Sequence, residues 1–409
     1  MTEEGRAVAI TGLGAVTPLG RDVASLWEGL CAGRSGIDAI TAFDASGLPV
    51  RIAGEVRGYT PHPSIPADRA HHIDRGALFA MDAALQALAD AGLTISAENA
   101  RRAGVVIGSA RPGDASAWEG QRIFHERGAQ ALKAGYAPRT LANTPSTQVT
   151  SATGARGPAL TVAAGGASGN AALALAAGMV RRGEVDIAIA GGSDAAITPP
   201  TMAAFAALTI LSKRNDEPAR ASRPFDADAD GMVISEGAAM VVLESAEHAR
   251  DRGARVYGRL AGSASITEPA AAIPSAEEAA RVIRAALDDG ALRETDFVCA
   301  YGSSMKPIDR LEMDALKQVF GEGAKRLVLS APKSMLGYPL GAAGVVDAIV
   351  CMKAIETGII PPTINLEGPA EGCDLDCVTG QARRLAARSA LCYAYGFGGH
   401  HIALCFAAP

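Results

Sequence analysis

The sequence predicts an α/β protein built on a mostly parallel, buried β-sheet. Short apolar runs rich in β-branched residues alternate with Ala-rich segments of helical period along most of the chain. The chain has 409 residues, enough for one large domain or two fused ones. Its 46 glycines and 48% hydrophobic residues are typical of tight turns between closely packed helices and strands.

The elements of the first half follow from this alternation. Apolar runs predict strands at 7–14, 102–110 and 185–192, and one more that starts at Leu160. Segments of helical period predict helices at 75–92 and 170–184. Strands separated by helices of this length are joined by crossover connections, which place neighbouring strands parallel in a sheet covered on both faces.

The second half repeats the plan of the first. Residues 296–304 resemble 102–110, residues 326–358 resemble 158–183, and residues 401–409 resemble 238–245. Such self-similarity indicates an internal duplication. The halves meet near a charged helix at 246–255, so we expect two units, 1–250 and 251–409, in one packed body. The first unit contains an insert at 110–158, whose final part, 139–158, is marked by prolines.

Composition excludes several classes of partner. A net charge of -6 argues against nucleic acid. The first six residues are polar, and no apolar run reaches the roughly 18 to 20 residues that cross a bilayer, so neither export nor membrane insertion is expected. Seven cysteines without regular spacing indicate reduced thiols in a cytoplasmic protein. Cys373 and Cys377 lack further ligands nearby, and we expect no metal and no cofactor.

Six motifs carry a resemblance to one family: "ITGLGAVTPLG" (10–20), "AGRSGI" (32–37), "SKRNDEPARASRPFDADADGMVISEGAAMVVLE" (212–244), "KSMLGYPLGAAG" (333–344), "PPTINLEGPAEGCDLD" (361–376) and "YGFGGHH" (395–401). The whole chain resembles the condensing β-ketoacyl synthases of fatty-acid and type II polyketide synthesis. The resemblance implies a duplicated thiolase-like fold with five layers, αβαβα, and a two-fold or pseudo-two-fold dimer. It also implies that the insert lies on the dimer and pocket side.

The turn that holds the nucleophile in active members of this family lacks it here. Those members carry a cysteine at a strand-to-helix turn after Gly-Pro, because a thiolate at a helix N-terminus is a good nucleophile near neutral pH. Counting from Gly157 and Pro158, that position is Gly166. The two histidine turns of the family read "AYGSS" and "KSMLGY", which places Tyr301 and Tyr338 at the histidine positions. A phenol donates a hydrogen bond but is a poor base near pH 7, so no residue is assigned as catalytic.

Other positions of the family's site are kept. Asp309 and Glu312 match its acidic pair, Lys333 its lysine, and Phe397 the phenylalanine that acts as a gate. With the catalytic trio absent, we expect the charged residues mainly to hold loops together through ion pairs and backbone hydrogen bonds.

A histidine pair and a serine are further candidates for a chemical role. His400 and His401 replace the family's Thr-Asn; adjacent strand residues face opposite ways, so at most one enters the pocket, and we assign His400 to it. No third metal ligand accompanies them. Ser168 lies two residues after the nucleophile position, where a serine that caps the first helical turn is the sufficient explanation.

These residues predict a non-catalytic subunit that resembles the chain-length factor, or ketosynthase β, of type II polyketide synthases. The resemblance implies a heterodimer in which a catalytic ketosynthase supplies the thiol and both imidazoles while this chain shapes the tunnel. Acyl carrier protein would be reached through the complex, because positions that are often basic are neutral or acidic here: Asp68, His71, His72 and Thr209. The candidates for interface and tunnel contact are Thr147, Gln148 and Thr150.

The sequence leaves the product and two other functions open. Chain-length factors of aromatic systems have glutamine where Gly166 stands, and the plain "SRPFD" at 222–226 is fatty-acid-like, which favours a branch that builds linear polyenes or reduced chains. One alternative is a repurposed enzyme that binds an acyl thioester and uses a tyrosine or histidine for cyclisation, acyl transfer or decarboxylation. The other is a homodimeric acyl-binding or scaffold protein.

Overall fold

A computed structural model describes residues 6–269 and 274–409. Within these ranges, eleven strands form one mixed sheet in the order β12-β10-β9-β14-β15-β8-β1-β7-β6-β4-β5. The strands of the first half are β1 (Val8–Val16), β4 (Ala103–Gly108), β5 (Ala159–Val162), β6 (Ile187–Asp194) and β7 (Gly237–Ser245). Those of the second half are β8 (Gly258–Thr267), β9 (Phe297–Cys299), β10 (Val328–Ser330), β12 (Asp376–Cys377), β14 (Ser389–Gly396) and β15 (His400–Ala407). Two short ribbons are separate: β2 (Asp38–Ala39) with β3 (Ile52–Ala53), and β11 (Ile359–Ile360) with β13 (Arg383–Arg384).

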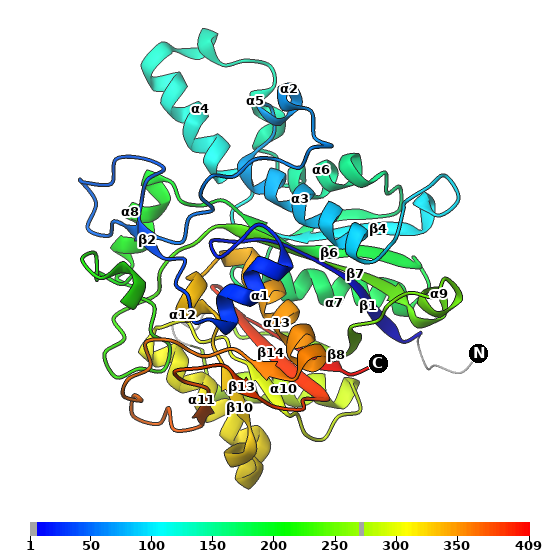
Figure 1. Cartoon of the computed structure of the whole chain (residues 1–409). Helices are drawn as coiled ribbons and strands as arrows, with labels where there is room; N and C mark the ends of the chain where they lie inside the picture. The colour runs from blue at the N-terminus through cyan, green and yellow to red at the C-terminus, as the bar shows by residue number, and fades with distance from the viewer. Residues whose placement is uncertain (1–5, 270–273) are drawn as a thin grey trace.

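Helices lie on both sides of each half of the sheet and give five layers (Figure 1). The outer layer over the first half contains α3 (Arg75–Asp90) and α6 (Thr144–Thr153). The middle layer contains α7 (Ser168–Arg181) and α13 (Ala343–Thr357), and the outer layer over the second half contains α10 (Ala276–Asp289) and α11 (Lys306–Phe320). The remaining helices are α1 (Val23–Cys31), α2 (Ala67–Ala70), α4 (Asp114–Arg127), α5 (Tyr136–Arg139), α8 (Pro199–Ala207), α9 (Ala246–Asp251) and α12 (Lys333–Leu336). The predicted αβαβα arrangement is confirmed.

The strand order shows the duplication directly. The first half runs β5-β4-β6-β7-β1 and the second runs β10-β9-β14-β15-β8, so each strand except β12 at the outer edge has a counterpart. The segments matched by sequence, 102–110 with 296–304 and 238–245 with 401–409, form such counterparts: β4 with β9, and β7 with β15. The two runs meet where Ala9 and Ile10 of β1 pair antiparallel with Arg259 and Gly258 of β8.

The expectation of a mostly parallel sheet needs correction. Parallel pairs occur only toward the two flanks, where β4 lies between β5 and β6, and where β9 and β10 pair with β14 and β12. In the middle, β7 runs antiparallel to both β6 and β1, and β15 runs antiparallel to both β14 and β8. The middle parts of β7 and β15 are apolar and buried on both faces, so the sequence pattern that signals a buried parallel strand fits them equally well.

Side chains that alternate along β7 fill two different cores. Ala238, Met240 and Val242 pack under α3 in the outer layer. Their neighbours in the sequence, Ala239, Val241 and Leu243, pack against the middle helices. A fully buried aliphatic side chain contributes about 1.5–3 kcal/mol to stability. The core under α3 therefore holds that helix on one face of the sheet, and the core of the middle layer holds α7 on the other. The N-terminus of α7 therefore has a fixed place at the carboxyl ends of the strands.

Two observations concern possible ligands and membranes. Among the residues that the structure describes, no helix combines the length and the apolar character that crossing a membrane requires. In the same part of the chain, no three His, Cys, Asp or Glu side chains gather in a way that would hold a metal ion. Cys373 is a free, buried thiol and Cys377 a free, half-buried one.

Candidate functional site

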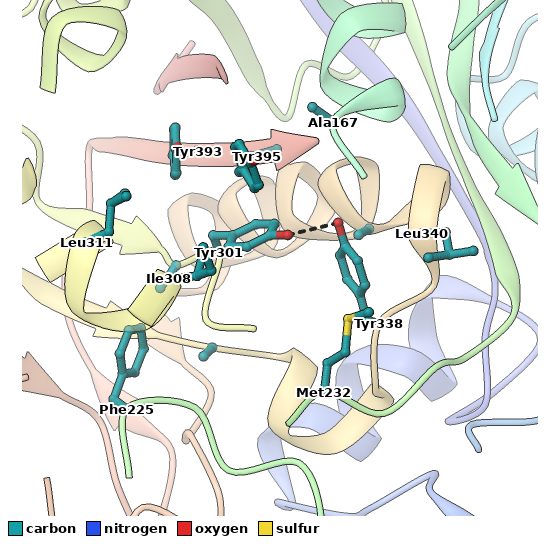
Figure 2. Packing of buried hydrophobic residues seen from close by; sticks show 14 of the residues in the cluster. Ala167, Phe225, Met232, Tyr301, Ile308, Leu311, Tyr338, Leu340, Tyr393 and Tyr395 are labelled. Atoms are coloured by element: carbon teal, nitrogen blue, oxygen red, sulfur yellow. Dashed lines mark hydrogen bonds between the residues drawn. The ribbon is translucent and has the colours of Figure 1, made fainter. Parts of the chain in front are cut away.

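The centre of the site is the turn between β5 and α7, which brings Gly166 to the N-terminus of α7. Two tyrosines from the second half face this turn: Tyr301 follows β9, and Tyr338 follows α12. Their hydroxyl oxygens lie 3.0 Å apart in a hydrogen bond, as Figure 2 shows, and their rings meet edge to face. The structure thus brings the three positions that the sequence singled out into one place.

Both phenols are buried and neutral. Tyr301 is 2% and Tyr338 5% exposed. Burial raises the pKa of Tyr301 well above its ordinary value, and the neighbouring Tyr338 raises it further. Burial also raises the pKa of Tyr338, although its hydrogen bond with Tyr301 opposes the shift. Neither hydroxyl therefore provides an anionic nucleophile or a base near pH 7.

A cavity of about 150 Å³ remains beside the tyrosine pair. Its wall is mostly apolar and contains Ala110, Arg111, Gly165, Gly166, Phe205, Met232, Tyr301, Met305, Tyr338, Leu340, Tyr395 and Phe397. A second hollow of about 340 Å³ lies on the other side of Met305, Tyr395 and Phe397, which line both. Phe397, 49% exposed in the turn between β14 and β15, lines both hollows.

Asp309 and Glu312 lie behind the wall of the cavity and hold the turn that carries Tyr301. Glu312 accepts hydrogen bonds from the backbone N–H groups of Tyr301 and Gly302, at 2.7 and 2.9 Å. Asp309 accepts from the N–H groups of Ser303 and Phe225, at 2.8 and 2.9 Å. Burial raises the pKa of Asp309 to about 6 and that of Glu312 to about 7, against the lowering effect of these donors.

Lys333 also lies behind the tyrosines, where it forms a buried ion pair. Its Nζ donates to Asp347 Oδ2 at 2.6 Å, and both side chains are at most 3% exposed. Burial by itself would lower the pKa of Lys333, but the attraction of the Asp347 carboxylate outweighs it and raises the pKa. The ammonium lies 5.4 Å from the ring centroid of Tyr301, close enough for a cation–π contact.

Sequence reasoning missed Asp194, a buried carboxylate at the end of β6. It accepts from Ser109 Oγ at 2.6 Å, from the N–H groups of Ala110 and Arg111 at 2.9 Å each, and from Gly341 N–H at 2.7 Å. Burial raises its pKa to about 6. Asp194 therefore joins the first half of the chain to the loop that carries Tyr338. An acidic residue at the end of a buried strand was the available signal.

The two adjacent histidines face opposite ways, as expected, but the buried one is His401. Its Nδ1 lies 2.8 Å from Tyr393 Oη and its Nε2 lies 3.3 Å from Glu268, and burial lowers its pKa. His400, which we assigned to the pocket, is half-buried and lines neither hollow. The reason is the alternation of side chains along β15, which turns His401 toward the core and His400 away from it.

The capping role expected for Ser168 is also wrong. Ser168 is the first residue of α7 rather than the residue before it. Its Oγ donates to the carbonyl of Gly165 at 2.6 Å and accepts from the N–H of Ala164 at 2.9 Å. The hydroxyl therefore closes the turn around Gly166 instead of satisfying the N–H groups of the helix.

The three candidate contact residues of the insert lie on α6, away from the cavity wall. Thr147 is exposed, and Gln148 and Thr150 are half-buried. Their side chains make local bonds: Thr150 Oγ1 donates to Thr147 O at 2.8 Å, and Gln148 Oε1 accepts from Arg69 at 3.4 Å. Helix α6 packs on β5, which ends the sheet on this side.

The sequence and the fold both match one group of known proteins. Residues 5–249 match the profile described as β-ketoacyl synthase, N-terminal domain, and residues 257–367 match that of the C-terminal domain. The chain belongs to the β-ketoacyl synthase family. It is 39% identical over 404 residues to 3-oxoacyl-[acyl-carrier-protein] synthase 2 of Coxiella burnetii, covering 97% of each chain.

Two solved ketosynthase structures are similar over the whole chain. The ishigamide ketosynthase/chain length factor matches with a TM-score of 0.90 and 33% identity, over 99% of this chain and 100% of that one. A ketosynthase bound to a hexaketide, in complex with its type II polyketide acyl carrier protein, matches with a TM-score of 0.90, 31% identity and the same coverage.

Proposed function

We propose that this chain is the non-condensing subunit of a ketosynthase pair, a chain-length factor that shapes the tunnel for a chain growing on a catalytic partner. One observation carries the proposal: the position of the family's nucleophile is Gly166, and two neutral tyrosines occupy the space around it. A glycine has no atom to acylate, and phenols of raised pKa do not replace imidazoles. A condensation involving this chain therefore needs a thiol from another polypeptide.

An outer face whose own strand and helix carry no charged residue supports the partner; the charges next to it are Arg156, between α6 and β5, and Arg69, which bonds to Gln148. We call β5 and α6 the edge face. Strand β5 ends the sheet, its residue Leu160 is 45% exposed, and residues 140–155 and 157–180 contain no Asp, Glu, Lys or Arg. Monomeric proteins protect such an open strand edge, whereas protein interfaces are depleted of charge at their centre. We infer that the partner ketosynthase covers the edge face and contacts Thr147, Gln148 and Thr150 of the insert.

The similarity to a protein named as a ketosynthase/chain length factor supports the same assignment, and the similarity to a type II polyketide ketosynthase favours a polyketide pathway. Acyl carrier protein would then meet the pair rather than this chain alone, in keeping with the complex known for the other polyketide neighbour. The Gly166 position and the fatty-acid-like "SRPFD" segment favour a linear polyene or reduced product.

Co-purification tests the proposal. A catalytic ketosynthase from the same organism is co-expressed with this chain, and native mass spectrometry is expected to show a one-to-one complex. Condensation should need both chains and should stop when the partner's nucleophilic cysteine is replaced. A homodimer that binds none of the ketosynthases tested, or a covalent acyl adduct on this chain alone, would overturn the proposal.

A matched pair of surface variants sharpens the test of the interface. Leu160→Glu places a charge in the centre of the edge face and is expected to abolish the complex, while the stability of the isolated chain changes by less than about 0.5 kcal/mol. Leu208→Glu is the control, because Leu208 is 59% exposed at the end of α8, outside the edge face. Equal loss of the complex in both variants would place the interface elsewhere.

The cavity at the tyrosine pair favours one second candidate, an enzyme that acts on a small acyl thioester without a cysteine. Among the residues described in its wall, Arg111 alone carries a charge, and its guanidinium pairs with Asp114 at 2.6 Å. A malonyl carboxylate would find no free cation there, so decarboxylation has little support. Turnover by the isolated chain that disappears in Tyr301→Phe or Tyr338→Phe would establish this candidate instead.

A further inference from the structure

The hydroxyl oxygen of Tyr338 occupies the space into which any side chain at position 166 would extend. A Cβ atom built on Gly166 would overlap this oxygen, and it would lie 2.7 Å from Tyr338 Cζ and 3.0 Å from the carbonyl oxygen of Tyr395. Real Cβ atoms essentially never lie within 3.0 Å of another heavy atom, so the two Tyr338 contacts are forbidden and the Tyr395 contact is tight. A side chain at position 166 and the present position of Tyr338 therefore exclude each other.

The backbone of the turn does not itself require glycine at this position. Gly165 has a φ of 56°, a left-handed conformation that favours glycine. Gly166 has no such φ, so its backbone would accept an L-residue. What forbids a side chain at position 166 is therefore the neighbouring phenol, with the Tyr395 carbonyl as a second, tight contact, and not the φ of the turn.

Tyr338 is held in this position from several sides. Its N–H donates to Val233 O at 2.7 Å and its carbonyl accepts from Ser235 N at 3.0 Å. Its hydroxyl bonds to Tyr301, whose ring packs edge to face on Tyr393 as well. Figure 2 shows the two hydroxyl groups meeting below the start of α7. Moving the ring aside would break this bond and expose or displace a buried aromatic side chain.

We infer that Tyr338 is the residue that closes this site to acyl groups, by steric exclusion of any nucleophile at the N-terminus of α7. Tyr301 acts as its support, through the hydroxyl–hydroxyl bond. This inference deepens the proposed function, since it rests on the site being non-condensing. It makes a separate physical claim about the isolated chain: restoring a cysteine at position 166 is not enough, because Tyr338 must also be removed.

The test compares thiol labelling in three variants of the full chain. Gly166→Cys is prepared alone, with Tyr338→Ala, and with Tyr395→Ala as the matched control. Tyr395 lines the same cavity and is equally buried, but removing its side chain leaves the Tyr338 oxygen in place. Each protein is treated with iodoacetamide, whose CH₂ group forms a bond to the thiolate while iodide leaves, and the label at position 166 is located by peptide mass mapping.

Labelling at position 166 is expected only when Tyr338 is removed. The Tyr338→Ala double variant should react at least about tenfold faster there than the Tyr395→Ala double variant, because thiol reactivity follows exposure and thiolate fraction, and a helix N-terminus favours the thiolate. Gly166→Cys alone should be insoluble or unlabelled. Equal labelling of the single variant and both double variants would overturn the inference, whatever partner this chain binds.

A second measurement keeps the inference falsifiable if a cysteine variant fails to fold. Gly166→Ala adds one methyl group and is introduced into the wild-type chain and into Tyr338→Ala. The substitution should lower the unfolding midpoint clearly in the wild-type chain and much less beside Tyr338→Ala, since the overlapping atom is gone. An equal decrease in both backgrounds would contradict steric exclusion by Tyr338.

Discussion

The centre of the site and the frame behind it are stabilised by different interactions. The centre consists of a glycine and two phenols, held by aromatic packing and one hydrogen bond between neutral groups. The frame consists of buried charged side chains, each bonded to backbone N–H groups or to an opposite charge: Asp194, Asp309, Glu312, Lys333 and Asp347. Most frame residues touch the centre only through the backbone they hold.

If the chain is the non-condensing subunit that we propose, this difference explains how it keeps the sequence motifs and fold of a β-ketoacyl synthase. Removing one member of a buried charged pair leaves its partner without compensation, which costs far more than the pair contributes. Exchanging neutral side chains around a cavity changes the stability only through the quality of the new packing. The centre can therefore change while the frame stays, and a retained Lys333 or Glu312 is no sign of retained catalysis.

The largest effect is expected from breaking the buried ion pair. Lys333→Met leaves the Asp347 carboxylate buried without its partner and should lower the free energy of unfolding by about 3–5 kcal/mol. Replacing both residues, as Lys333→Met with Asp347→Leu, should restore much of that loss because no charge is left unpaired. Guanidinium unfolding midpoints measure both. If the double variant is no more stable than the single one, the frame is not held by charge pairing.

A dependence on pH is expected next, through buried acids with raised pKa, among them Glu312 and Asp309 of the turn that carries Tyr301. Burial raises the pKa of Glu312 to about 7 and that of Asp309 to about 6, above the values of 4.5 and 3.8 in the unfolded chain. Between about pH 4.5 and 7 the folded protein then binds more protons than the unfolded chain. Its stability therefore falls as pH rises through this window, by at most about 1.4 kcal/mol per pH unit for each proton.

Thermal unfolding between pH 5 and 7.5 measures this decline, and Glu312→Gln should make it shallower. The control is Glu322→Gln, because Glu322 is exposed, pairs with Lys325, and has a lowered rather than a raised pKa. Profiles of equal slope for wild type and Glu312→Gln would show that Glu312 is ionised throughout the window. The frame would then be more strongly solvated than its burial indicates.

Much of the fold could be predicted from the sequence, because periodicity reports burial. The strands at 7–14 and 185–192 and the helix at 75–92 appear as β1, β6 and α3 with ends shifted by a few residues. The directions of β7 and β15 could not be predicted. An apolar run in a strand buried on both faces has the same pattern whichever way the neighbouring strand runs.

The centre of the site was also predictable, by counting from a motif to Gly166, Tyr301 and Tyr338. The long-range contacts that these residues make could not be predicted. Asp194 bonds to Gly341, 147 residues further along the chain, and the Tyr338 oxygen fills the space above Gly166 across the interface between the two halves. Such pairings depend on the packing of α7 against the second half, which local propensity does not describe.

The smallest effect is expected at the centre itself. Tyr301→Phe removes one hydrogen bond and should cost about 0.5–1.5 kcal/mol, since the Tyr338 hydroxyl loses its partner. Tyr338→Phe should cost a similar amount for the same reason. If the hydroxyls serve only each other, the double variant should cost no more than either single one, and unfolding curves of the three variants measure this. Additive losses would mean that each hydroxyl has another hydrogen-bond partner. The centre would then be held by several polar bonds, as the frame is.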